Sequence, residues 1–123
     1  MKRFVRVLIK DASSTRYLVL KEKKRKGVWN FPGGKVELEE KMEHACIRET
    51  EEETSLQVCG LQLLMTACFK LNHVEWQGYY YLANEVKGEL LLKEKGILEM
   101  TYFTKAEIES NDNVFLSSIS EHI

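Results

Sequence analysis

Residues 48–53 read Arg-Glu-Thr-Glu-Glu-Glu, and the spacing of these acids favours metal chemistry. On an α-helix, at roughly 100° per residue, Glu49, Glu52 and Glu53 share one face, whereas Glu51 points the other way. Like charges three or four residues apart destabilise a helix by about 0.2–0.5 kcal/mol per pair, and acids in a last turn oppose the helix dipole. A hard divalent cation with oxygen ligands would offset this repulsion, so the acidic face is a candidate metal site.

The element that must present these acids is a helix, which the apolar periodicity predicts over residues 39–53. Met42 and Ala45 lie seven and four residues before Glu49, so the acids continue the stripe that should be buried. Cys46 also falls on the buried face, and we interpret it as a small hydrophobic residue and not as a nucleophile. Thr54 and Ser55 mark the expected end of the helix.

A loop over residues 27–34 precedes the helix and reads Gly-Val-Trp-Asn-Phe-Pro-Gly-Gly. Its proline restricts the preceding residue, and the glycine pair permits close approach of backbone atoms to a ligand. Trp29 and Phe31 are interpreted as core or loop anchors, with stacking on a base as the alternative. The amides of Asn30, Asn111 and Asn113 could read a purine edge, although turn formation explains all three equally well.

Residues 21–26 place five cations in six positions, directly before this loop. Such a run forms either a solvated loop that blunts a strand end or a rim that attracts polyphosphate. His44 and His73 have no partner set that would bind zinc.

With this loop in place, the spacing from Gly34 through Glu40, Arg48-Glu49 and Glu52-Glu53 to Leu56 resembles the box of the Nudix family. The preceding residues 29–37, Trp-Asn-Phe-Pro-Gly-Gly-Lys-Val-Glu, also resemble the lead-in to that box in MutT-like proteins. Several fixed spacings must coincide to produce this match, so its specificity is high.

The resemblance implies a Nudix-type α/β/α sandwich with a mixed β-sheet, in which the box forms a loop-helix-loop catalytic motif. It implies hydrolysis of a nucleoside diphosphate linked to another moiety, with Mg²⁺ or Mn²⁺ as cofactor. In this chain the implied metal ligands are Glu49, Glu52, Glu53 and the Gly34 carbonyl, with Glu40 supporting the metal site. Arg48 would hold the carboxylates in place by charge-assisted hydrogen bonds.

Substrate contacts and the base that deprotonates water remain open at this point. Lys35 is placed to meet a phosphate, and Asn30 is a candidate for substrate binding. Glu52 and Glu53 are the first candidates for the base. Glu99 is the second, because relatives often carry a Glu shortly before an aromatic pair such as Tyr102-Phe103; an ordinary acid at a strand edge is the alternative.

The box departs from the family pattern at three positions. Ser55 stands where a glycine normally ends the helix with a left-handed residue, so we expect an altered or strained helix end. Thr50 replaces a usual aliphatic residue, and Glu39 replaces a common glycine. None of these changes touches an acid of the candidate metal site.

The remaining pattern predicts an α+β layered domain over residues 1–123. Residues 4–9 and 16–20 read as a β-hairpin, residues 60–69 and 74–82 as further strands, and residues 97–103 as a last strand. Residues 88–95 are ambiguous. A capping box at residues 104–107 predicts a short helix, and residues 114–123 predict a second amphipathic one.

Composition restricts the class of protein. At 44% hydrophobic and 30% charged residues the chain is typical of soluble domains, and its net charge of -1 gives no global attraction to nucleic acid or to a membrane. No signal peptide or apolar span is recognisable, and three unpaired cysteines favour reduced thiols, so we expect a cytoplasmic location. Family members are often dimers, so a homodimer is possible on the resemblance.

We therefore predict a metal-dependent Nudix pyrophosphohydrolase that acts on a small nucleotide polyphosphate and not on a nucleic-acid polymer. A MutT-like (d)NTP or oxidised-dNTP pyrophosphohydrolase is the leading subtype. The alternatives are a nucleotide-binding regulatory module with the same fold and no turnover, and a domain whose acidic helix binds a partner's basic surface.

Overall fold

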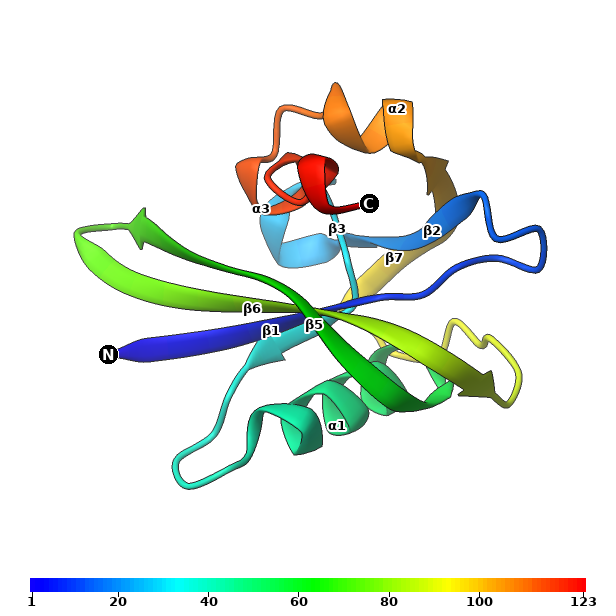
Figure 1. Cartoon of the computed structure of the whole chain (residues 1–123), viewed down its shortest axis with the longest axis horizontal. Helices are drawn as coiled ribbons and strands as arrows, with labels where there is room; N and C mark the ends of the chain where they lie inside the picture. The colour runs from blue at the N-terminus through cyan, green and yellow to red at the C-terminus, as the bar shows by residue number, and fades with distance from the viewer.

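A computed structural model describes residues 1–123 and shows two β-sheets with helices on either side (Figure 1). The strands are β1 (Lys2–Leu8), β2 (Arg16–Glu22), β3 (Trp29–Asn30), β4 (Gly33–Lys35), β5 (Gln57–Leu71), β6 (Val74–Lys87) and β7 (Ile97–Thr104). The helices are α1 (Met42–Thr54), α2 (Lys105–Glu109) and α3 (Val114–Ser117), with short 3-10 helices η1 (Lys23–Arg25) and η2 (Ser120–His122).

The larger sheet is mixed and has the strand order β4-β1-β6-β5, in which only β1 and β6 run parallel. The smaller sheet is antiparallel, with the order β3-β2-β7. Helix α1 lies on one side of the sheets, and α2 and α3 lie on the other (Figure 1). The predicted α+β sandwich with a mixed sheet is therefore confirmed.

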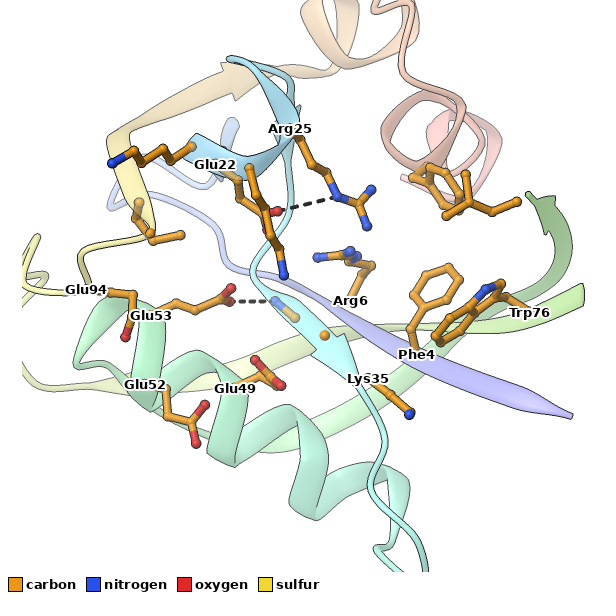
Figure 2. Close-up of a pocket in the computed structure, with 18 residues that line it drawn as sticks. Phe4, Arg6, Glu22, Arg25, Lys35, Glu49, Glu52, Glu53, Trp76 and Glu94 are labelled. Carbon is orange, nitrogen blue, oxygen red and sulfur yellow. Dashed lines mark hydrogen bonds and ion pairs between the residues drawn. The ribbon is translucent and has the colours of Figure 1, made fainter. Parts of the chain in front are cut away.

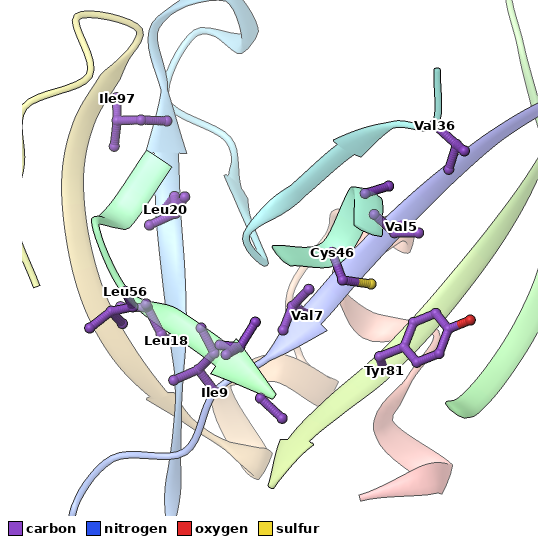
Figure 3. Close-up of a cluster of buried hydrophobic side chains, with 13 residues drawn as sticks. Val5, Val7, Ile9, Leu18, Leu20, Val36, Cys46, Leu56, Tyr81 and Ile97 are labelled. Atoms are coloured by element: carbon purple, nitrogen blue, oxygen red, sulfur yellow. The ribbon is translucent and has the colours of Figure 1, made fainter. Parts of the chain in front are cut away.

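Strand β1 is buried on both faces, which explains its nearly continuous apolar run. Alternate side chains of a strand point to opposite faces. Val5 and Val7 join a core of 13 buried residues that includes Cys46 of α1 (Figure 3). Phe4 and Leu8 join a second core of nine buried residues, which α2 and α3 cover. Arg6 lies between Phe4 and Leu8 along β1 and shares their face of the strand. A charged side chain therefore projects towards the second core.

Helix α1 begins at Met42, so the prediction of a helix from residue 39 was wrong at its start. Glu39 has φ 66° and Lys41 has ψ 148°, and neither is a helical conformation. The Glu40 amide instead donates to the Glu37 carbonyl in a turn, at 3.0 Å. The burial of Cys46 is as predicted, and burial raises the pKa of its thiol to about 12.

The predicted hairpin of residues 4–9 and 16–20 was also wrong. β1 and β2 meet only at an isolated bridge between Lys10 and Tyr17 and then separate into the two sheets. Both strands are buried on both faces, and each gains two longer ladders by separating, β1 with β4 and β6, and β2 with β3 and β7.

Strands β5 and β6 are longer than predicted and form a single long hairpin. The two residues between them, Asn72 and His73, have φ 50° and 66°, as a type I′ turn requires. A register shift between Leu63 and Met65 lets the pair bend without ending.

The remaining elements confirm some expectations and correct others. The capping box is present, with the Thr104 hydroxyl accepting from the Glu107 amide at 3.2 Å. The predicted helix over residues 114–123 is broken, since α3 ends at Ser117 and η2 follows. The predicted loop over residues 27–34 contains β3 and the start of β4. None of the helices has the length and apolar character needed to cross a membrane.

Candidate active site

A cavity of about 890 Å³ opens between α1, β1 and η1 (Figure 2). One wall is acidic and is formed by Glu49, Glu52 and Glu53 of α1. The opposite side is cationic, with Arg6 from β1 and Arg25 from η1. Phe4, Trp76 and Phe115 close one end with aromatic surface. A ligand with an anionic part and a flat apolar part would fit this distribution of charge.

The β1–β4 ladder fixes the floor of the cavity. Arg6 pairs with Gly33, and Val5 pairs with Gly34. The Gly33 amide donates to Glu53 Oε1 at 2.8 Å, which ties the acidic helix to this strand. A Cβ atom at Gly34 would lie 2.6 Å from the Glu49 carboxylate, so a larger residue here would displace that side chain from its present position. The Gly-Gly pair therefore positions two of the three acids.

Partial burial disfavours the ionised forms of Glu49 and Glu53. Desolvation raises the pKa of Glu53 to about 8, against the hydrogen bond from Gly33, which acts to lower it. Desolvation also raises the pKa of Glu49, although Arg48 opposes that shift. A carboxylate whose pKa is raised by burial is one whose ionised form would gain from a nearby cation.

Arg48 organises the outer part of the acidic wall. Its Nε and Nη2 donate to the two carboxylate oxygens of Glu40 at 2.8 and 2.9 Å, and its Nη1 donates to Glu49 at 3.0 Å. Nη1 also lies 3.5 Å from a carboxylate oxygen of Glu52. Hydrogen bonding to Arg48 holds the pKa of Glu40 at about 2. The same guanidinium donates to the Lys35 carbonyl at 3.1 Å, so helix and loop are joined at one point.

The acids are not drawn together into a finished metal-binding cluster. No group of three or more His, Cys, Asp or Glu side chains is arranged to hold an ion. Glu49 and Glu52 are held by Arg48, whereas the Glu53 carboxylate is held by the Gly33 amide. The oxygen donors and their uncompensated burial nevertheless fit a hard divalent cation.

The predicted site residues divide into three groups by position. The structure brings Gly34, Lys35, Glu49, Glu52 and Glu53 together at the cavity (Figure 2). It places Glu40 and Arg48 behind the acidic wall, where they bond to each other.

The other two predicted residues lie elsewhere. Asn30 is buried at 1% exposure, and its Oδ1 accepts from the Phe31 amide at 2.9 Å. Glu99 lies on β7 with its carboxylate 3.3 Å from Lys21, and neither residue lines the cavity. The acid that does reach the cavity from this part of the chain is Glu94, in the loop before β7 (Figure 2).

Reasoning from the sequence missed Arg6, Glu22 and Glu94 as cavity residues, whereas Arg25 belongs to the cationic run 21–26 for which a rim that attracts polyphosphate was one alternative. A signal was present for Arg6, because it interrupts an otherwise apolar strand. For Glu22 and Glu94 no local signal exists, since ordinary charged loops and strand ends contain the same residue types.

Comparison with known proteins agrees with this geometry. The NUDIX domain family model matches residues 2–121. The chain belongs to the Nudix family.

Two curated relatives are similar to parts of this Nudix chain. An 8-oxo-dGTP diphosphatase of Proteus vulgaris is 39% identical over 70 residues, which cover 55% of this chain and 61% of that protein. An 8-oxo-dGTP diphosphatase of Buchnera aphidicola subsp. Acyrthosiphon pisum (strain APS) is 31% identical over 83 residues, which cover 68% of this chain and 59% of that protein. The chain thus spans about three fifths of the length of these relatives.

A solved structure matches over almost the whole length. The MutT NUDIX hydrolase from Burkholderia pseudomallei superposes with a TM-score of 0.88 at 25% identity, covering 99% of this chain and 97% of that one. The Nudix fold is therefore shared from end to end.

The three departures from the usual Nudix box have visible structural consequences, and Glu39, like Ser55, has a positive φ, of 66°. Ser55 adopts the left-handed conformation of the missing glycine, with φ 67° and ψ 3°, and its amide donates to the Glu51 carbonyl at 2.9 Å. Thr50 is completely buried, and its hydroxyl has no hydrogen-bond partner. Both defects lie away from the acidic wall.

Proposed function

We propose that this chain hydrolyses a diphosphate linkage of a nucleoside di- or triphosphate derivative with Mg²⁺ or Mn²⁺ as cofactor. A (d)NTP or an oxidised dNTP is the leading substrate. The observation that carries the proposal is the cavity itself, in which an acidic wall with oxygen ligands faces guanidinium groups beside aromatic surface. Family membership and the names of the two curated relatives support the same class of substrate.

Glu49, Glu52, Glu53 and the Gly34 carbonyl would hold the divalent ions. Bound there, such ions neutralise phosphate oxygens, orient a water molecule and stabilise the leaving oxygen. The Gly33 amide keeps Glu53 Oε1 in place, which leaves Oε2 free to face the cavity. Arg48 keeps Glu49 and Glu52 from turning away, because one guanidinium nitrogen contacts both carboxylates.

We assign the proton transfer to Glu53, with Glu52 as the second candidate. Glu53 is the more deeply desolvated of the two, and its carboxylate is fixed by the Gly33 amide, whereas Glu52 is exposed. Water would lose its proton to the Glu53 carboxylate as its oxygen bonds to phosphorus, and the bridging P–O bond would break with its electron pair leaving on the departing phosphate oxygen. Glu94 is the further acid on this cavity and replaces Glu99 as the candidate from the region before β7.

The substrate side of the cavity is cationic and aromatic. Lys35, Lys23 and Lys24 line its rim and would attract a polyphosphate, and the side chains of Phe4 and Trp76 offer flat surface to a base. This arrangement supports a small nucleotide better than a polymer, because the acidic wall faces the cationic side and would repel an extended phosphate backbone.

A substrate panel tests the proposal. NTPs, dNTPs, oxidised dGTP, ADP-ribose and dinucleoside polyphosphates are incubated with Mg²⁺, and released pyrophosphate and phosphate are measured. We expect pyrophosphate release from at least one nucleoside triphosphate. Binding of nucleotides with no turnover of any would overturn the hydrolase and favour a nucleotide-binding module.

A further inference from the structure

Arg6 is the only basic side chain among the buried residues, with 5% of its surface exposed. It lies in the middle of β1 and lines the cavity between the acidic wall and the aromatic end (Figure 2). Its Nη1 donates to the Phe31 carbonyl at 3.0 Å, which fixes the guanidinium in place. Its Nε is buried and has no hydrogen-bond partner.

The charge of Arg6 is also left without an ion pair. Glu22 and Glu53 are the nearest acids, but neither lies within ion-pair distance of Arg6. Glu22 is paired instead with Arg25 at 3.5 Å, and Glu53 accepts from the Gly33 amide. A buried guanidinium with an open donor is costly, and Phe4 and Leu8 show that this face of β1 otherwise takes apolar residues.

The position of Arg6 shows what its open donor can reach. The β1–β4 register sets Arg6 opposite Gly33, the residue bonded to Glu53, so its guanidinium lies next to the proposed reaction centre. On the other side, its Cζ lies 5.5 Å from the centre of the Phe4 ring. A group bound by Arg6 would therefore sit between the metal-holding acids and the aromatic surface.

We propose that Arg6 binds a non-bridging oxygen of the phosphate that stays on the nucleoside, and so makes that phosphate a requirement for binding. The inference rests on the proposed function, which supplies a nucleotide whose distal phosphates lie at the acids. Guanidinium groups form strong charge-assisted hydrogen bonds with phosphate, and a buried one gains most from such a partner. Arg6 is thereby a specificity-determining residue that the Nudix box does not contain.

Binding of deoxyguanosine 5′-monophosphate and of deoxyguanosine, each without metal, tests the role of Arg6. The Arg6→Gln variant removes the charge but keeps an amide donor for the Phe31 carbonyl. We expect its affinity for the monophosphate to fall about tenfold or more, while its affinity for the nucleoside stays within about twofold. The matched control is Arg3→Gln, an exposed arginine of the same strand outside the cavity, which should bind both ligands as the wild type does.

A folded Arg6→Gln protein with unchanged affinity for the monophosphate would overturn the proposal. Equal losses of affinity for the monophosphate and the nucleoside would also overturn it, because they would place Arg6 at the base and not at the phosphate. Should Arg6→Gln fail to fold in a thermal melt, Arg6→Lys replaces it, because lysine keeps the charge but lacks the fork of donors. If Arg6→Lys binds the monophosphate and the nucleoside with the same ratio of affinities as the wild type, the proposal is also overturned.

The substrate panel separates this proposal from the one on which it rests. If the wild type turns over a nucleotide while Arg6→Gln keeps the wild-type KM and the wild-type affinity for the monophosphate, that result would overturn only the role of Arg6. A wild type that turns over no nucleotide removes the proposed hydrolysis, whatever the behaviour of the variant.

Discussion

The two faces of α1 both carry groups that destabilise the folded protein, but they differ in kind. On the cavity face, Glu49 and Glu53 are half-buried carboxylates whose pKa values are raised by desolvation. On the core face, Thr50 buries a hydroxyl without a partner, and Ser55 ends the helix in a left-handed conformation. A bound cation can relieve the unfavourable charge on the cavity face. The unfavourable groups on the core face can be removed only by changing the sequence.

This difference separates destabilisation that belongs to a binding site from destabilisation that has no role in binding. Strain at a binding site is relieved when the ligand arrives, so metal should remove it. A buried hydroxyl or a left-handed serine gains nothing from a ligand, so its removal should stabilise the protein with and without metal. The following predictions test this contrast.

The largest effect should follow from replacing Glu53 with glutamine. Glu53→Gln removes a proposed metal ligand and the proposed base, and we expect kcat/KM to fall by at least about 100-fold. The matched control is Glu51→Gln, an exposed acid on the opposite side of the same helix, which should retain activity. Full activity of a folded Glu53→Gln protein would contradict the assignment of the site.

The same acid should make the stability of the metal-free protein depend on pH. The pKa of Glu53 rises from its ordinary value of 4.5 to about 8 on folding, so the folded state binds more protons than the unfolded state between these values. The stabilisation is complete below pH 4.5 and is lost as the pH rises through about 8.

Chemical denaturation in EDTA at several pH values measures this dependence. The free energy of unfolding should decrease across the interval in the wild type, and Glu53→Gln should flatten the curve. A wild-type curve that rises throughout the interval would show that the buried carboxylate is not the dominant titrating group.

Addition of Mg²⁺ should stabilise the wild type, because the ion binds the folded state. At a concentration of 100 times the Kd the gain is about 2.7 kcal/mol. A thermal melt with Mg²⁺ should show a higher Tm than one with KCl at equal ionic strength, and the shift should shrink in Glu49→Gln. Equal shifts in both proteins would place the ion elsewhere.

On the core face, Thr50→Val should stabilise the protein by about 1 kcal/mol, because it removes a buried unpaired hydroxyl with little change of shape. Thr54→Val provides the opposite control. The Thr54 hydroxyl donates to the Thr50 carbonyl at 2.6 Å and accepts from the Leu56 amide at 3.1 Å, so its loss should be destabilising. Urea denaturation distinguishes the two outcomes, and a loss of stability in Thr50→Val would show an unrecognised partner.

The smallest effect should come from Ser55→Gly. A left-handed conformation is unfavourable for serine and free for glycine, but glycine also gains entropy in the unfolded chain, so we expect a net gain of about 0.5–1 kcal/mol. Ser55→Ala keeps the backbone strain but removes the serine hydroxyl, which is also buried without a partner, so it separates the two causes and should gain less than Ser55→Gly. Equal stability of the two variants would assign the effect to the serine hydroxyl and not to the backbone.

Local patterns predicted most of α1 and its charged residues. Glu49, Glu52, Glu53 and Arg48 lie within two turns, so helical periodicity alone places them together. The helix start was misjudged, because Glu39 in a left-handed turn cannot be distinguished from a helical glutamate by its residue type.

Predictions of strand pairing failed where strands from distant parts of the chain compete to pair with the same strand. The hairpin of residues 4–9 and 16–20 was plausible locally, but ladders to β4, β6 and β7 were available only from distant parts of the chain. Glu99 was predicted and Glu94 was missed for a similar reason. Only the pairing of β7 with β2 sets Glu99 beside Lys21, while Glu94 lines the cavity.

The sequence by itself determined the acidic helix face, the glycine pair before it and the family to which both point, because short-range spacing defines them. The tertiary structure alone decided what faces those acids. Arg6, Arg25 and the aromatic end come from strands and turns far from the box, and the register of β1 on β4 brings Arg6 opposite Gly33. Register depends on the burial of both faces of β1 at once, which no local pattern contains.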